Sequence, residues 1–136
     1  MDKTIVIIIV AVILAGAGFW AWQSGFFTGN VVPPTPLPEG IVLFFGQDCP
    51  HCKIVEEFIV ANNIDQKVEF TNLEIPFNGK TSPELVANSE VLVQVAKECK
   101  IDTSSGISIP FLFDGKQCLV GQDDIINFFK NKAGIN

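Results

Sequence analysis

Residues 41–59 read IVLFFGQDCPHCKIVEEFI, an apolar run followed by two cysteines and then by a mixed segment. The first five residues are apolar and stop at Gly46, which is typical of a strand buried on both faces. Over 50–63 the apolar residues recur with the spacing of a helix, at Ile54, Val55, Phe58 and Ile59. The stretch therefore predicts a strand and then a helix, with Cys49 and Cys52 at their junction.

The chain beyond this stretch predicts two more helices and three more strands. Ser82, Pro83 and Glu84 form a helix-start signature, because a capping hydroxyl is followed by proline and by an acid in the first turn. Asp114-Gly115 is a hairpin turn signal. In chain order we predict a strand over 67–75, a helix over 82–100, strands over 110–113 and 116–120, and a helix opened by Asp123 and Asp124. In these two helices we expect the inward-facing residues to be Leu85, Leu92, Val93, Ala96, Ile125, Ile126, Phe128 and Phe129.

The resulting order, β-α-β-α-β-β-α, predicts an α/β fold. Two strands joined through a helix are parallel, whereas the final hairpin adds an antiparallel edge. We therefore expect one small mixed sheet over residues 41–136, with helices on both of its faces.

A long uncharged segment precedes this domain. Residues 4–38 carry no charged side chain, and Thr4 to Trp22 is nearly all Ile, Val, Ala, Leu and Gly. A bilayer core of ~30 Å needs about 20 apolar residues at ~1.5 Å each, so we predict a transmembrane anchor over 1–26. Lys3 precedes the span, which places the N-terminus in the cytoplasm and the domain outside the cell membrane. The alternative is a cleaved signal peptide, because Ala15-Gly16-Ala17 resembles a cleavage site.

A proline-rich linker joins this segment to the domain. Residues 32–38 read VPPTPLP, and such a stretch favours an extended, semi-rigid spacer. The sequence therefore divides into an anchor over 1–26, a linker over 27–40 and a domain over 41–136.

The charge of the chain excludes one class of function. It carries 15 acidic residues against 9 basic ones, for a net charge of −6, and every basic residue is a lysine. Phosphate recognition relies on basic patches and on guanidinium groups, so we expect no nucleic acid as partner.

The two cysteines carry the chemistry because of where they lie. A thiolate at a helix N-terminus is stabilised by free backbone N–H groups and by the helix dipole. Pro50 suits the first turn, where a missing N–H costs nothing. We expect Cys49 at the exposed helix start to attack, and the inward Cys52, one turn on, to resolve the mixed disulfide. His51 is the one histidine of the chain; as a hydrogen-bond donor or as a cation it favours the thiolate, and otherwise it is an exposed residue without a role.

Three segments resemble a known family. Residues 46–53, GQDCPHCK, resemble the active site of the thioredoxin superfamily, and Pro50-His51 is similar to the dipeptide of the periplasmic disulfide oxidases. Residues 108–113, SIPFLF, resemble the cis-proline strand, and residues 114–124 are similar to the end of a glutaredoxin. The resemblance covers 41–130 and implies a thioredoxin/glutaredoxin-like fold. It also implies that Pro110 is cis beside the cysteine pair, and that Ile109 offers its backbone to an extended substrate.

Two features depart from the family. Thioredoxins carry a buried acid where this chain has Leu43, so proton transfer to and from Cys52 must use water or another group, near Glu56. Asp123 or Asp124 could serve a glutathione site, but clear basic contacts for its carboxylates are absent.

The roles of Cys99 and Cys118 stay open at this point. In an oxidising compartment they suggest a structural disulfide, while two free thiols or a second redox pair are the alternatives. A zinc site made by all four cysteines is disfavoured, because the later two lack CxxC spacing.

The sequence thus predicts a membrane-anchored, extracytoplasmic thiol–disulfide oxidoreductase that acts on protein thiols and disulfides. We expect no cofactor and no bound metal, and a membrane redox partner that resets the pair is compatible with the anchor. The alternatives are a glutathione-dependent glutaredoxin and a non-catalytic module of the same fold. Such a module could also handle metal, because a reduced CxxC binds soft ions such as Cu(I). The direction of electron flow is left open.

Overall fold

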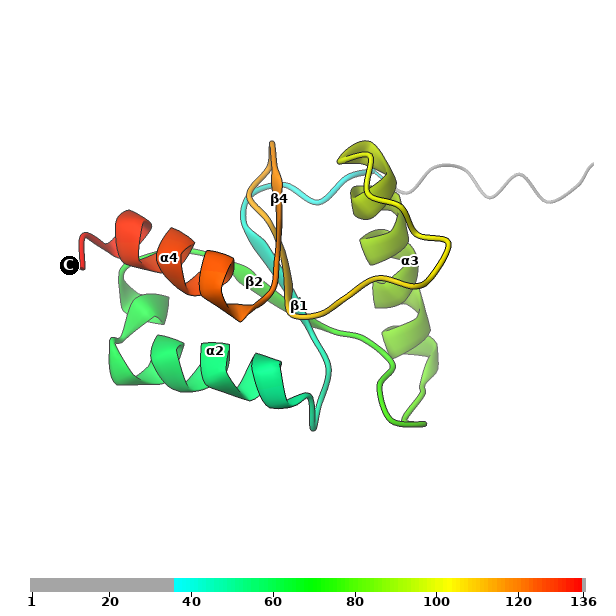
Figure 1. The fold of residues 1–136 in the computed structure, drawn as a ribbon, viewed down its shortest axis with the longest axis horizontal. Helices are drawn as coiled ribbons and strands as arrows, with labels where there is room; N and C mark the ends of the chain where they lie inside the picture. Colours follow the sequence, from blue (N-terminus) through cyan, green and yellow to red (C-terminus); the bar gives the residue numbers. More distant parts are fainter. Residues whose placement is uncertain (1–35, 136) are drawn as a thin grey trace, which may run out of the picture. The chain divides into compact units, whose positions relative to one another are not determined.

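Four strands form one mixed sheet in the computed structural model, which describes residues 36–135 (Figure 1). The strands are β1 (Val42–Phe45), β2 (Thr71–Glu74), β3 (Phe111–Phe113) and β4 (Cys118–Val120), in the sheet order β2-β1-β3-β4. β1 runs parallel to β2 and antiparallel to β3, and β3 pairs antiparallel with β4. The predicted α/β fold with a mixed sheet is confirmed.

Three helices cover the sheet, with α2 (Pro50–Ala61) and α4 (Gln122–Ala133) on one face and α3 (Pro83–Glu98) on the other (Figure 1). The two faces hold separate apolar clusters. Leu43 packs with residues of α2 and α4, whereas Val42 and Phe44 pack with residues of α3. Because β1 is buried from both sides, its sequence is apolar throughout rather than alternating.

The helix termini follow the signals in the sequence. Ser82 caps α3, because its side-chain oxygen accepts the backbone N–H of Leu85 at 3.2 Å, and Pro83 opens the helix. α4 carries Asp123 and Asp124 in its first turn and lysines in its last, as the helix dipole favours.

The predicted strand over 67–75 is wrong in its first half. Residues Ile64–Gln66 form the 3-10 helix η1, and the backbone N–H of Val68 donates to the carbonyl of Ile64 at 2.8 Å. Only Thr71–Glu74 pair with β1, which is itself four residues long. β2 is therefore only as long as its partner β1 and begins at Thr71, although the side chains before Thr71 alternate as in a strand.

Two apolar side chains that we expected on a buried face are exposed. Ile54 is 42% exposed, because α2 buries the narrower stripe Cys52, Val55 and Ile59. Val93 is 37% exposed, because α3 turns Leu92, Val95 and Ala96 to the sheet.

The predicted anchor over 1–26 and the first part of the linker lie outside the described residues. Among residues 36–135, none of the helices is long and apolar enough to cross a membrane.

Candidate active site

Cys49 lies directly before α2 and is its N-cap residue. Its backbone is extended, and its sulfur accepts the backbone N–H of Cys52 at 3.3 Å. The carbonyl of Cys49 then accepts the N–H of Lys53 at 3.1 Å, as the first hydrogen bond of the helix. A sulfur in this position faces the positive end of the helix, where a negative charge is stabilised.

Both cysteines are free thiols, and both are buried, with 3% of Cys49 and 6% of Cys52 exposed. The expectation that Cys49 is exposed is therefore wrong. The backbone carbonyl of Ile109 lies 4.0 Å from the Cys49 sulfur. A reaction partner must therefore approach the Cys49 sulfur beside Ile109 and Pro110.

Cys52 has a strongly perturbed acidity. Burial and, after it, the hydrogen bond with Cys49 raise the pKa of the Cys52 thiol to about 12, against the opposing effect of the Gly46 backbone. Cys52 therefore remains protonated at neutral pH.

The Ile109–Pro110 peptide bond is cis, as the family resemblance implied. Pro110 is fully buried, and its carbonyl accepts the N–H of Gly121 at 2.9 Å, which joins this segment to the start of α4. The structure thus brings the Ile109–Pro110 segment close to Cys49, as the family resemblance implied.

His51 is exposed and contacts a residue that the sequence did not single out. Its Nδ1 lies 2.8 Å from Oε1 of Gln122, the first residue of α4. Because an amide oxygen only accepts, Nδ1 carries the hydrogen. The bond joins the starts of α2 and α4, and the only available signal was that Gln122 lies in the glutaredoxin-like segment 114–124.

On the other side of the pair, Asp48 is neutralised by lysines. Its carboxylate lies 2.9 Å from Nζ of Lys80 and 3.8 Å from Nζ of Lys53. The hydrogen bond and charge of Lys80, with a smaller contribution from Lys53, lower the pKa of Asp48. An acidic residue next to Cys49 therefore does not leave an unpaired negative charge there.

Gly46 fits between two segments that shape the site. A Cβ atom at this position would lie 2.7 Å from Cβ of Phe77 and 2.9 Å from Cδ1 of Ile109. A side chain here would push Ile109 away from the cysteines, so the glycine keeps the strand end and the Pro110 segment together.

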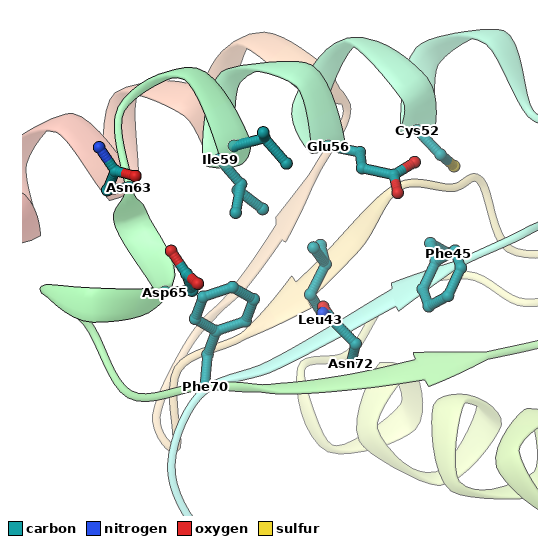
Figure 2. A pocket seen from close by; sticks show the side chains of 10 residues that line it. Leu43, Phe45, Cys52, Glu56, Ile59, Asn63, Asp65, Phe70 and Asn72 are labelled. Carbon is teal, nitrogen blue, oxygen red and sulfur yellow. The ribbon is translucent and has the colours of Figure 1, made fainter.

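Two hollows flank the pair. The first, of about 340 Å³, lies below α2 and is lined by Cys52 and Glu56, with Leu43 on the opposite wall (Figure 2). The second, of about 550 Å³, lies between His51, Ile109 and the start of α4. Its charged lining residues, among those that the structure describes, are Asp123 and Asp124, and no lysine is among them.

Cys99 and Cys118 form a disulfide that joins the end of α3 to β4. Free thiols at these positions, one of the open alternatives, do not agree with the structure. A zinc site from all four cysteines does not agree either, because two of the sulfurs are bonded to each other. Within residues 36–135, no three His, Cys, Asp or Glu side chains come together as a metal site.

No protein-family model, no curated protein and no solved structure matches the chain. The functional assignment therefore rests on the residues and their arrangement.

Proposed function

We propose that this chain is a thiol–disulfide oxidoreductase of the thioredoxin superfamily, with a glutaredoxin-like domain, that exchanges disulfides with protein substrates. One observation carries the proposal: the Cys49 sulfur caps α2, is hydrogen-bonded by Cys52, and lies beside the carbonyl that precedes cis-Pro110. Such a reaction needs a nucleophilic sulfur and a second thiol one turn away. It also needs a backbone segment to which an extended substrate can bind.

The proposed reaction has two steps. The Cys49 thiolate attacks one sulfur of a substrate disulfide, and the other substrate sulfur leaves as a thiolate. Cys52 then loses its proton and attacks Cys49, which releases the second substrate sulfur and leaves a Cys49–Cys52 disulfide. Two electrons pass from the pair to the substrate, and the reverse sequence oxidises a substrate dithiol.

The same proposal includes the location of the domain. The anchor over 1–26 would hold the domain at the outer face of the cell membrane, with the linker as spacer, and a membrane partner would reset the pair. The Cys99–Cys118 disulfide supports an oxidising compartment, where such bonds persist.

Glutathione as the obligatory partner is less well supported. The hollow beside His51 carries two carboxylates from Asp123 and Asp124, and these would repel the carboxylates of glutathione. An extended protein segment does not bring two carboxylates to this position.

Reduction of insulin by dithiothreitol tests the proposal. The full-length chain should shorten the time to turbidity, and Cys49→Ser should behave as the reaction without protein. If the wild-type chain neither reduces insulin nor oxidises a reduced, unfolded substrate, the catalytic proposal is wrong, and a binding or metal-handling module is favoured.

A further inference from the structure

The buried thiol of Cys52 needs a proton acceptor. Its pKa of about 12 leaves it protonated at neutral pH, whereas the second step of the proposed reaction requires its thiolate. Leu43 is the β1 residue on the opposite wall of the cavity, and it is apolar. The acceptor must therefore come from another element.

Of the two carboxylates that line the cavity below α2, that of Glu56 lies nearer to Cys52 than that of Asp65 (Figure 2). Glu56 follows Cys52 by one helical turn, so both side chains lie on the same face of α2. Figure 2 shows the Glu56 carboxylate extending along the helix toward the Cys52 sulfur, while Asp65 lies at the far end of the cavity beside Phe70.

The size and lining of the cavity suit water. It measures about 340 Å³, and each water occupies ~30 Å³ in the liquid, so several fit. The side-chain amides of Asn63 and Asn72 provide polar partners within it. Glu56 is itself exposed, so a proton that it accepts can pass on to solvent.

We propose that Glu56 accepts the proton of Cys52, through water in this cavity, when Cys52 resolves the mixed disulfide, and that it returns the proton in the reverse direction. This inference rests on the proposed function. The S–H bond of Cys52 breaks and its proton moves to the Glu56 carboxylate. The sulfur then bonds to Cys49, the bond from Cys49 to the substrate sulfur breaks, and the substrate leaves as a thiolate that takes up a proton from solvent.

The charges around Glu56 come from two elements, α2 and η1. Lys53 and Glu57 flank it on α2, Asp65 faces the cavity from η1, and Asn72 of β2 is neutral. Lys53 is also within 3.8 Å of Asp48. From β1, the cavity receives only the apolar Leu43 and Phe45.

A coloured aryl disulfide separates the two steps of the reaction. With dithiobis(nitrobenzoate) and the reduced full-length chain, the first equivalent of nitrothiobenzoate reports attack by Cys49. The second equivalent reports resolution by Cys52. Glu56→Gln removes the proposed acceptor, and Glu57→Gln is the matched control, because it removes the same charge from the same helix but does not line the cavity with Cys52.

We expect Glu56→Gln to slow the second phase on the order of 10-fold or more and to leave the first phase unchanged, whereas Glu57→Gln changes neither. The pH profile is the decisive readout. Resolution in wild type should be flat from about pH 6 to 8, because transfer of the proton to an acceptor in the site makes the rate independent of the thiolate fraction of Cys52. In Glu56→Gln it should rise about tenfold per pH unit, as the thiolate fraction of a group with a pKa of about 12 does. Glu56→Asp should restore part of the rate and the flat profile.

Two results would overturn the proposal: equal second-phase rates in Glu56→Gln and Glu57→Gln, or a wild-type profile with the same slope as Glu56→Gln. Either leaves the proposed function in place, because the first phase still occurs. Absence of the first phase in wild type would instead contradict the proposed function.

Discussion

The domain contains two cysteine pairs that differ in almost every physical respect. Cys49 and Cys52 lie three positions apart at the start of one helix, and both are free thiols. Cys99 and Cys118 join two different elements through a disulfide that closes a loop with a sequence separation of 19. The same side chain thus occurs as a free thiol in one region and as a cross-link in another.

The direction of the adjoining helix explains this difference. Cys49 lies at the N-terminus of α2, where the helix dipole stabilises a thiolate, whereas Cys99 is the C-cap of α3, where the dipole disfavours one. Thiol–disulfide exchange proceeds through thiolates, so a sulfur at a helix C-terminus is a poor nucleophile. Helix polarity therefore agrees with the proposal that Cys49 and Cys52 are the pair that exchanges.

The largest expected effect is on covalent trapping at the first pair. Cys52→Ser should accumulate mixed disulfides with a disulfide-containing substrate, because attack by Cys49 continues but resolution is lost. Cys49→Ser should accumulate none, because the buried Cys52 stays protonated. Non-reducing electrophoresis of the full-length variants measures both. Equal trapping by the two variants would break the assignment of roles within this pair.

Removal of the second pair should affect stability and not chemistry. Cys99→Ala with Cys118→Ala should lower the free energy of unfolding by about 3 kcal/mol, because the unfolded chain regains the entropy of the closed loop. Denaturant titration without reductant measures the loss.

The matched control is Cys49→Ala with Cys52→Ala, which deletes the free pair and should cost only about 1 kcal/mol. Insulin reduction by the folded Cys99→Ala, Cys118→Ala chain should remain. Loss of that activity with the fold intact would show that Cys99 and Cys118 relay electrons and are not a purely structural cross-link.

The fold was predictable where the signal is local. The continuous apolar run of β1, the Ser82 cap of α3 and the turn at Asp114-Gly115 each depend on neighbouring residues, and each element lies where it was expected. The strand over 67–75 was not predictable in its first half. Val68 alternates with charged neighbours as in a strand, but its N–H is used by the carbonyl of Ile64.

The site was predictable only in the part that is contiguous in sequence or carried by the family resemblance. Cys49, Cys52 and Pro110 belong to recognisable segments. Gln122 and Lys80 reach the site through long side chains from 71 and 32 residues away. The one signal for Gln122 was its place in the glutaredoxin-like segment 114–124, and Lys80 had none. Cys49 is buried, and the carbonyl of Ile109, 60 residues away in sequence, lies 4.0 Å from its sulfur, so a helix-start position alone did not indicate this burial.

The smallest expected effect concerns His51, which adjusts the first pair without taking part in exchange. Its ring is held at the start of α4 by Gln122. From there it adds a polar, protonatable group to the end of α2 that carries Cys49. The disulfide between Cys99 and Cys118 has no histidine neighbour of this kind, because the chain has a single histidine.

His51→Ala should therefore make the Cys49–Cys52 pair less oxidising. The thiolate exists only in the reduced form, so a group that stabilises it raises the reduction potential, and ~30 mV corresponds to ~1.4 kcal/mol for two electrons. An exposed imidazole is screened by solvent, so we expect a fall of about 30 mV, measured by equilibration with glutathione redox buffers. Gln122→Ala is the control: it keeps the imidazole but frees it, and should lower the potential by less than half as much. Asp48 does not oppose the effect, because Lys80 already neutralises it. An unchanged or higher potential in His51→Ala would show that the helix terminus alone sets the redox character of Cys49, and that His51 serves only to join α2 to α4.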